Sequence, residues 1–341
     1  MNDYNHVPLL DVNGKKIHAH GGSIIKIDGT FYWYGENKEG IWERNGHNKC
    51  PYWHHGMKYY SSKDLISWQD EGFLIEENGD ENSPFHSKNV VDRPHVIFNK
   101  KINKYVCWCK TCTGQSFSKT MFSICIGDTL NKMQYVKSFI PEPFEAGDFD
   151  LFEYEDKGYI IFENPHYNMV LYELSDDYMS LGKKYSTHID YPYPPYVREA
   201  PCFFTYNKRL YILTSGTTGY YPNSTICYDI TNLHGEWKEV NHPCIKDIKN
   251  NSFSLQFSSV FNFNNRLIAL GDRWLNDIKE DMPDINEIFK WIYSKGKEGL
   301  YLSDEQLGEV LSLENTSLAT YVWLDIEFID GKPIIENKNN Y

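Results

Sequence analysis

The chain has 341 residues, of which 41% are hydrophobic, so it carries enough apolar side chains for a substantial core and is not expected to be disordered. Its formal net charge of −13 argues against nucleic acid as a partner, and no apolar run approaches the length of a membrane span. Aromatic residues make up 16% of the chain, an excess that suits β-structure and also the stacking of sugar rings.

The N-terminal stretch, residues 1–16, lacks a basic end followed by an apolar segment, so we expect no secretion signal. The eight cysteines show no regular spacing, which favours free thiols in a reducing cytoplasm. Cys107 and Cys109 lie one strand repeat apart, an arrangement that favours ordinary packing over metal ligation. The expectation is therefore a cytoplasmic protein with no metal, no other cofactor and no membrane partner.

One motif recurs along the chain, a turn of Asp, Asn, Lys or Gly followed by an aromatic-rich strand. Its five copies lie at 27–36, 101–110, 155–164, 206–216 and 263–274. Some copies are followed by another strand and a polar turn that contains Trp, as in 59–72 and 227–240. Units of roughly fifty residues with several short strands are typical of propeller blades, so we predict an all-β, five-bladed β-propeller.

Helical periodicity is almost absent before residue 283. Residues 283–296 and 303–315 are predicted to form two short helices, and Ser303 followed by Gln306 fits a capping box. We interpret residues at about 275–315 as a helical insertion in the last blade, after which 320–335 resumes the β pattern and is expected to close the ring. No Pro-rich or Ser-rich linker divides the chain, so residues 1–341 are predicted to form a single domain.

Four carboxylates occur where predicted inner strands begin or end: Glu36, Asp92, Asp148 and Glu199. The innermost strands of a propeller converge on a central funnel, so these side chains can meet there although they are far apart in sequence. Converging carboxylates suit glycoside hydrolysis, in which one carboxyl group protonates the leaving oxygen and another complements it.

Eight segments in order along the chain resemble glycoside hydrolase family 43, and more narrowly its exo-β-1,3-galactanase branch. They are 18–38, 59–72, 91–109, 147–152, 198–204, 212–223, 269–274 and 321–328. The resemblance implies a five-bladed propeller and an exo-acting, inverting hydrolase that releases a terminal sugar, β-linked galactose, from a neutral oligosaccharide. Two alternatives stay open: another family 43 specificity (arabinofuranosidase or xylosidase), and a non-catalytic propeller that binds sugar.

Carried over by motif, the resemblance implies that Glu199 in "REAPCFF" is the general acid and that Asp148 raises the pKa of that acid. Asp92 stands where the branch has Glu and is implied to contact substrate. Most of the family has an Asp base in the first blade, whereas this chain has "HAHGGS" at 18–23. The branch shares that absence and uses a Gln from the fifth blade, which corresponds here to Gln256. Strand alternation would then point Gln256 into the funnel, opposite Glu199.

Each of these residues also has a purely structural interpretation. Glu199 could pair with Arg198, Asp92 could pair with Arg93, and Asp148 could be a turn residue. Glu36 could cap a blade edge, and Gln256 could be an ordinary polar residue on a strand.

Trp274, Asp272 and His20 are the remaining candidate contacts of the sugar. Trp274, in the matching "GDRW", is the aromatic residue that we favour as a stacking platform. Asp272 in the same segment and Glu36 are reserve candidates for the base. His20 could bind a sugar hydroxyl or be a satisfied structural histidine.

Overall fold

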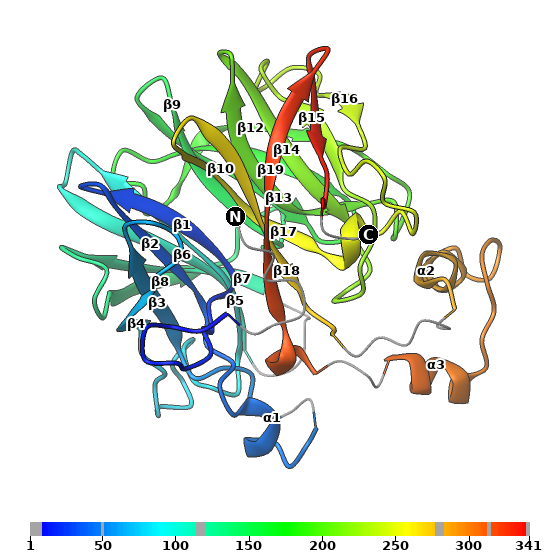
Figure 1. Cartoon of the computed structure of the whole chain (residues 1–341), viewed down its shortest axis with the longest axis horizontal. Coiled ribbons are helices and arrows are strands. Elements are labelled where there is room, and N and C mark those ends of the chain that lie inside the picture. The colour runs from blue at the N-terminus through cyan, green and yellow to red at the C-terminus, as the bar shows by residue number, and fades with distance from the viewer. Residues whose placement is uncertain (1–8, 49–50, 114–119, 277–282, 312–314, 339–341) are drawn as a thin grey trace.

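The computed structural model describes residues 9–48, 51–113, 120–276, 283–311 and 315–338. Its strands form five antiparallel sheets, each built from four strands that are consecutive in the chain (Figure 1). The first sheet contains β1 (His20–Ile27), β2 (Thr30–Glu36), β3 (Met57–Ser62) and β4 (Gln69–Ile75). The second contains β5 (Val90–Asn99), β6 (Lys104–Cys112), β7 (Thr120–Gly127) and β8 (Gln134–Phe139).

The remaining three sheets follow the same order. The third contains β9 (Phe149–Tyr154), β10 (Lys157–Asn164), β11 (Asn168–Leu174) and β12 (Leu181–His188). The fourth contains β13 (Arg198–Tyr206), β14 (Arg209–Gly216), β15 (Ile226–Asp229) and β16 (Lys238–Asn241). The fifth contains β17 (Gln256–Phe263), β18 (Arg266–Arg273), β19 (Thr320–Ile329) and β20 (Lys332–Ile335).

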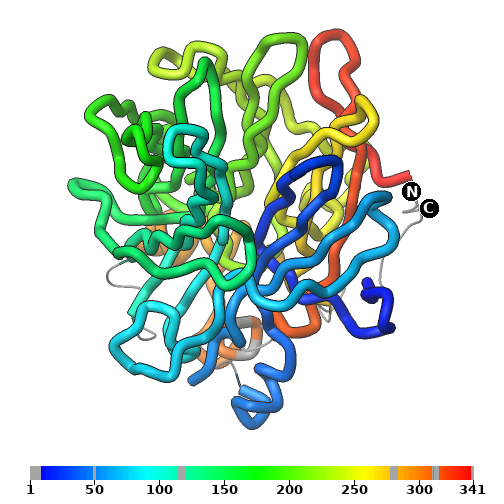
Figure 2. Tube along the Cα trace, turned by 90° about the vertical axis from the view of Figure 1, so that its left-hand side faces the viewer, coloured from blue at the N-terminus to red at the C-terminus, as the bar shows by residue number. Residues whose placement is uncertain are grey.

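The first strands of the five sheets form a closed ring of contacts, in which β1 meets β5, β5 meets β9, β9 meets β13, β13 meets β17 and β17 meets β1. The hairpins of the sheets are arranged around this common centre (Figure 2). The predicted five-bladed propeller is thereby confirmed. Residues 320–335 complete the fifth blade as β19 and β20, and the ring closes through the contact of β17 with β1.

The recurrent turn in the sequence is the hairpin that joins the first and second strands of a blade. In four blades this turn has two residues, both with positive φ: Asp28-Gly29, Glu155-Asp156, Asn207-Lys208 and Asn264-Asn265. Two successive positive φ values make a type I′ turn, whose twist matches that of the flanking strands and which favours Asn, Asp and Gly. The repeat is therefore a direct consequence of the blade geometry.

The helical insertion lies between β18 and β19 and contains α2 (Ile285–Tyr293) and α3 (Asp304–Leu311), within the two predicted segments. The predicted capping box is present, because Ser303 N donates to Gln306 Oε1 at 3.0 Å and Gln306 N donates to Ser303 Oγ at 3.3 Å. Both helices lie on one side of the propeller, away from the short α1 (Ile41–Arg44) (Figure 1). None of the helices in the described ranges has the length and apolarity that crossing a membrane requires.

Aromatic side chains join the last blade to the first. The ring of Trp33 on β2 lies 4.5 Å from that of Tyr321 and 5.1 Å from that of Trp323, both on β19, and 5.4 Å from that of Trp68. Trp33 and Trp68 have no exposed surface. Since this cluster spans the point where the ring closes, its packing contributes to holding the first and fifth blades together.

We predict that Trp33→Ala lowers the free energy of unfolding by about 3–5 kcal/mol, because the large cavity would lie between the first and last blades. Urea denaturation followed by fluorescence measures this change. Ile66→Ala is the control, since Ile66 is 61% exposed and its truncation should cost less than about 0.5 kcal/mol. Equal midpoints for the two variants would contradict the role of the cluster in ring closure.

Candidate active site

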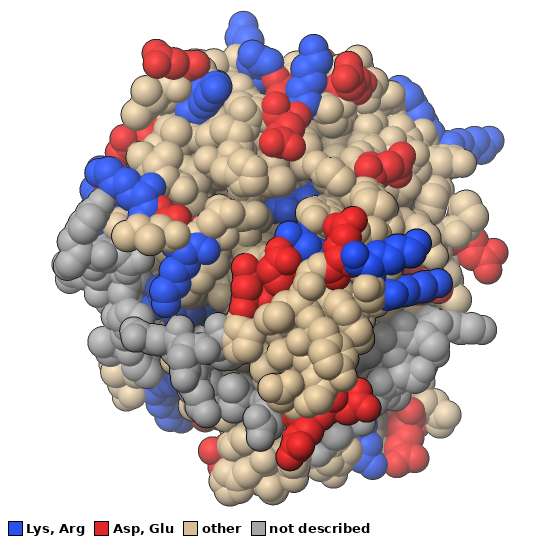
Figure 3. Space-filling model, turned by 90° about the vertical axis from the view of Figure 1, so that its right-hand side faces the viewer, with Lys and Arg blue, Asp and Glu red and all other residues tan. Residues whose placement is uncertain are grey.

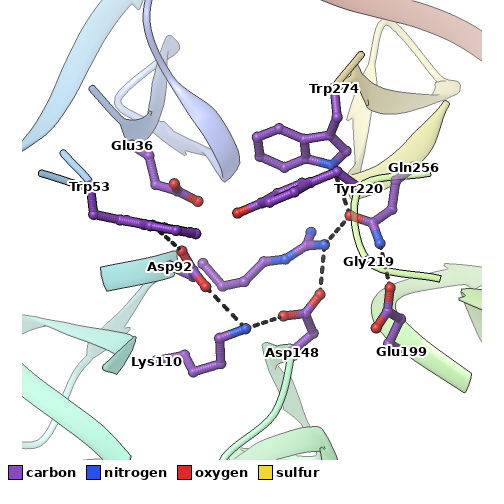
Figure 4. Close-up of a pocket in the computed structure, with 11 residues that line it drawn as sticks. Glu36, Trp53, Asp92, Lys110, Asp148, Glu199, Gly219, Tyr220, Gln256 and Trp274 are labelled. Carbon is purple, nitrogen blue, oxygen red and sulfur yellow. Dashed lines mark hydrogen bonds and ion pairs between the residues drawn. The ribbon is translucent and has the colours of Figure 1, made fainter. Parts of the chain in front are cut away.

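The funnel contains a cavity of about 180 Å³ to which all five blades contribute side chains. On the side of the molecule that carries α2 and α3, the surface is hollowed near its centre, and Lys or Arg atoms are visible in the hollow (Figure 3). The lining residues are Glu36, Trp53, Asp92, Arg93, Lys110, Asp148, Glu199, Gly219, Tyr220, Gln256 and Trp274 (Figure 4). Six of the eight predicted site residues are among them, whereas His20 and Asp272 are not.

Two inner strands use the same backbone device to present a carboxylate. The register of β5 shifts between Asp92 and His95, and that of β13 shifts between Glu199 and Cys202. In each case the residue after the carboxylate has positive φ, 53° at Arg93 and 48° at Ala200, and a proline follows. Such bulges bend a strand and re-aim its side chains, and proline fits because the bulge leaves its position without a ladder hydrogen bond.

The guanidinium group of Arg198 does not line the cavity and instead forms hydrogen bonds within its own blade. Its Nε donates to Thr214 Oγ1 at 3.1 Å, and its Nη2 donates to the carbonyl oxygens of Thr214 and Ser224, each at 2.7 Å. Glu199 instead faces the cavity and accepts a hydrogen bond there. The structural interpretation in which Glu199 simply pairs with Arg198 is therefore not supported.

Two cations hold Asp148. Arg93 Nη2 lies 2.7 Å from Asp148 Oδ2, and Lys110 Nζ lies 2.8 Å from Asp148 Oδ1 (Figure 4). Lys110 also reaches Asp92 at 3.1 Å, so Asp92 pairs with Lys110 and not with its neighbour Arg93. Burial acts to raise the pKa of Asp148, but Arg93 and Lys110 outweigh it and hold that pKa below its ordinary value. Asp148 is therefore a carboxylate anion.

Glu199 is in the opposite electrostatic state. Burial raises the pKa of Glu199 well above its ordinary value, and the negative charges of Glu163 and Asp148 raise it further. The protonated form is thus favoured, as a general acid requires. The cavity therefore contains one ionised carboxylate and one protonated carboxyl group. Two carboxyl groups whose pKa values differ in this way can take different chemical roles.

Sequence reasoning missed Glu163 and Lys110. Glu163 lies near the end of β10, is 5% exposed, and has its pKa raised to about 7 by burial and then by Asp148. A signal was present, because Glu36 ends β2 in "FYWYGE" and Glu163 occupies the same place in "GYIIFEN". Lys110 stands near the end of β6, the equivalent strand of the second blade. The ends of second strands therefore supply charged groups to the funnel in three blades.

The amide of Gln256 is oriented by its neighbours. Its Oε1 accepts hydrogen bonds from Arg93 Nη2 at 2.5 Å and from Trp274 Nε1 at 2.9 Å, and both partners can only donate. Its Nε2 donates to Glu199 Oε1 at 2.9 Å and to Ser215 Oγ at 3.1 Å. Gln256 faces the funnel as expected, but it lies in direct contact with Glu199 instead of opposite to it.

Aromatic side chains form one side of the cavity (Figure 4). The ring of Tyr220 lies 5.1 Å from that of Trp274 and 6.4 Å from that of Trp53. Trp53 Nε1 donates to Asp92 Oδ1 at 3.1 Å, and Lys38 Nζ lies 4.8 Å from the Trp53 ring centre. Aromatic faces beside hydroxyl-binding carboxylates are the usual composition of a site for a sugar ring.

Glu36 reaches the cavity beside two glycines. Its Oε2 lies 2.9 Å from Lys38 Nζ, and burial raises the pKa of Glu36 to about 7 although Lys38 acts in the opposite direction. A Cβ atom on Gly21, whose φ is +59°, would lie 2.9 Å from Glu36 Oε1, and one on Gly22 would lie 1.7 Å from the Tyr34 carbonyl oxygen. The close approach of the β2 backbone excludes a side chain at Gly22, whereas at Gly21 the positive φ and the nearby Glu36 side chain disfavour one.

His20 and Asp272 lie beneath the cavity. His20 is completely buried, its ring stacks on Tyr321 at 4.8 Å, and its Nδ1 lies 3.3 Å from Asp272 Oδ1. The second oxygen of Asp272 accepts a hydrogen bond from Gly21 N at 3.1 Å. Burial lowers the pKa of His20 well below its ordinary value and raises that of Asp272 to about 7, so this pair has the spacing of an ion pair but is neutral below pH 7.

Two cysteines of β6 pack between the first and second blades. Cys107 and Cys109 on β6 are both completely buried in an apolar cluster that includes Tyr34 and Met57. Within the described ranges, no group of three His, Cys, Asp or Glu side chains is placed to hold a metal ion together.

Burial of Asp272 generates a prediction about stability and pH. Its carboxyl group is protonated in the folded chain up to about pH 7 but loses its proton near pH 4 when unfolded, so its contribution to the free energy of unfolding declines as pH rises between these values. Asp272→Asn removes this titration. In urea denaturation between pH 4 and pH 7.5, the free energy of unfolding of this variant should therefore decline less than that of wild type, by up to roughly 4 kcal/mol over the window.

The control for this measurement is Asp176→Asn, because the side chain of Asp176 is 92% exposed. Its stability should follow the wild-type pH dependence. If Asp272→Asn and wild type decline in parallel, Asp272 is already ionised in the folded chain at acidic pH.

No protein-family model and no curated protein matches the sequence, but solved structures do match the fold. A family 43 β-1,3-galactosidase aligns with a TM-score of 0.77 and 24% identity over 97% of this chain and 61% of its own. A second family 43 β-1,3-galactosidase, solved with galactodeoxynojirimycin, aligns with a TM-score of 0.76 and 21% identity over 98% of this chain and 99% of its own. The chain has the fold of family 43 glycoside hydrolases.

An exo-β-1,3-galactanase from Phanerochaete chrysosporium, solved with β-1,3-galactotriose, aligns with a TM-score of 0.75 and 21% identity. The alignment covers 96% of this chain and 65% of the fungal one. The chain thus spans less than two thirds of that enzyme and of the first galactosidase, and nearly all of the second.

Proposed function

We propose that the protein is an exo-acting, inverting glycoside hydrolase that releases terminal β-1,3-linked galactose from a neutral oligosaccharide. The observation that carries the proposal is the placement of a protonated Glu199 near an ionised Asp148 in one cavity beside aromatic side chains. The choice of galactose rests on the similar solved structures, two described as β-1,3-galactosidases and one as an exo-β-1,3-galactanase.

The size of the cavity supports exo action. Its volume of about 180 Å³ equals that of about six water molecules at roughly 30 Å³ each, which is the scale of one sugar unit. A funnel with one such cavity at its centre accepts a chain end and not the middle of a long chain. Asp92 and Glu36 are proposed to accept hydrogen bonds from hydroxyl groups of that sugar, and Trp274 to cover its face.

In the proposed reaction, Glu199 donates its proton to the glycosidic oxygen as the bond to the anomeric carbon breaks. A water molecule attacks that carbon from the opposite face and gives an inverted product, and its proton passes to the amide oxygen of Gln256 while Gln256 Nε2 releases one to solvent, or in reserve to Glu36. Asp148 does not transfer a proton. Its negative charge, held by Arg93 and Lys110, raises the proton affinity of Glu199 and so keeps the acid protonated until the substrate needs it.

We propose that Gln256 takes part in positioning the attacking water. The carbonyl oxygen of Gln256 already accepts hydrogen bonds from Arg93 and Trp274, so a sugar ring must first enter between Gln256 and Glu199 and rearrange these contacts. Glu36 is the reserve base, because with a pKa of about 7 it can accept a proton near neutral pH. His20 and Asp272 would then act as positioning residues beneath Gly21.

We predict that Glu199→Gln lowers kcat for β-1,3-galactobiose by roughly 10²- to 10⁴-fold, because the leaving sugar needs protonation. Dinitrophenyl β-galactoside has a good leaving group that needs little protonation and should lose much less. Steady-state kinetics on both substrates test this difference, and equal losses on both would contradict the acid role.

Two other outcomes of the same kinetics decide the alternative functions. Turnover of aryl arabinofuranosides or xylosides in preference to galactosides would favour another family 43 specificity. Binding of galactose by calorimetry without turnover of any of these glycosides would favour a non-catalytic sugar-binding propeller.

For Gln256→Ala we expect a loss of hydrolysis of at least roughly 100-fold while binding of galactose survives, since the amide is proposed to position the attacking water. Glu36→Gln is the matched comparison, because it removes the reserve base and keeps the shape of the side chain. Early proton NMR spectra of the wild-type reaction should show the α-anomer first. Near-normal turnover by Gln256→Ala together with loss in Glu36→Gln would transfer the water-activating role to Glu36.

A further inference from the structure

A second cavity of about 570 Å³ adjoins the first on the far side of the general acid. The two cavities share Lys110, Glu199 and Gly219 as lining residues. The second cavity extends between the β10–β11 turn and helix α2 of the insertion. Glu199 therefore stands at the boundary between a small cavity and a larger one.

Helix α2 contributes an aromatic wall to this second cavity. Phe289 and Tyr293 line it, and their rings stack at 6.1 Å with an interplanar angle of 24°. The Tyr293 ring also lies 5.4 Å from the ring of His166 on the β10–β11 turn, so the wall meets the propeller across the cavity. Tyr293 is 37% exposed, which leaves part of its ring accessible to a ligand.

The wall is firmly attached to the rim of the first cavity. Ile285 and Ile288 on the buried face of α2 pack in one cluster with Trp274 and Tyr221. Trp274 thus contributes to the first cavity and also to the packing beneath α2. Since the aromatic wall and the sugar cavity share this support, their relative position is set by side-chain packing.

The position of Glu199 decides what the second cavity can hold. A general acid must contact the oxygen that joins the departing group to the cleaved sugar. With the terminal sugar in the first cavity, that oxygen lies at Glu199 and the departing group lies beyond it. The only one of the two cavities left for that group is the second one, where the exposed ring of Tyr293, beside the partly buried Phe289, can stack on a sugar face.

We propose that the second cavity is the leaving-group site and that Phe289 and Tyr293 of helix α2 form its sugar-stacking wall. This inference rests on the proposed hydrolase function and makes the insertion a determinant of specificity. The favoured leaving group is a neutral sugar, because the exposed Glu145 also lines the cavity and would repel an acidic one. Its volume, about three times that of the first cavity, also accommodates leaving groups longer than one sugar.

The test compares two substrates that share galactose and differ in the leaving group. The leaving group of β-1,3-galactobiose is a sugar, whereas that of β-galactosyl fluoride is a single atom that cannot reach α2. We expect Tyr293→Ala to lower kcat/KM for galactobiose by roughly 3- to 10-fold, mostly through KM, and to leave kcat/KM for the fluoride within about twofold of wild type.

The matched control is Tyr301→Ala, the same substitution in the same insertion at a tyrosine that is 63% exposed and does not line the cavity. This variant should leave kcat/KM unchanged for both substrates. Tyr293→Leu keeps apolar bulk without an aromatic face and carries the same expectation as Tyr293→Ala, so it replaces that variant if Tyr293→Ala does not fold.

The outcomes separate this inference from the function on which it rests. If wild type cleaves galactobiose and the Tyr293 variants do so equally well, the leaving-group site is wrong while the hydrolase function stands. If kcat/KM of the variants falls equally for both substrates, Tyr293 supports the fold or the acid, and the stacking role is overturned. If wild type cleaves neither galactobiose nor the fluoride, the proposed function fails and the inference fails with it.

Discussion

Asp148 lies between the cations of Arg93 and Lys110, and the charge balance of the whole funnel depends on this contact. A cavity that buries several carboxyl groups is electrostatically costly, since each anion loses its hydration and repels the others. The two cations keep Asp148 ionised, whereas burial favours the protonated forms of Glu163 and Glu199. Glu199 is therefore a proton donor because it is buried and lies near the ionised Asp148, and not because of its own sequence neighbours.

The backbone conformation positions the side chains of this arrangement. Bulges at Asp92 and Glu199 turn two inner strands so that equivalent carboxylates of different blades face the axis. The ends of the second strands bring Lys110 and Glu163 to the same level of the funnel. Helix α2 then lies over the rim, with Trp274 common to the cavity and to the packing of the insertion. Repetition of one blade geometry thus gives each blade a similar place from which to present a polar group.

Much of the site could be predicted because its residues mark the blade repeat. Glu199 and Asp148 were found through local motifs, and the structure places both in the cavity. The partners of Gln256 could not be predicted, because Arg93, Trp274 and Glu199 come from three different blades and their contacts depend on side-chain orientation. Lys110 was overlooked since a lysine at a strand end looks like an ordinary exposed residue until a buried Asp148 is placed beside it.

The sequence by itself determined the number of blades, the hairpin turns and the two helices of the insertion, because each depends on contacts between residues that are close in the chain. Only the tertiary structure decided the protonation states and the boundary between the two cavities. A pKa depends on burial and on charges within a few ångströms, and here those charges come from residues up to about a hundred positions apart, as for Arg93 and Glu199. The position of Tyr293 beside the acid was likewise decided by how α2 packs on Trp274, a contact that no local pattern encodes.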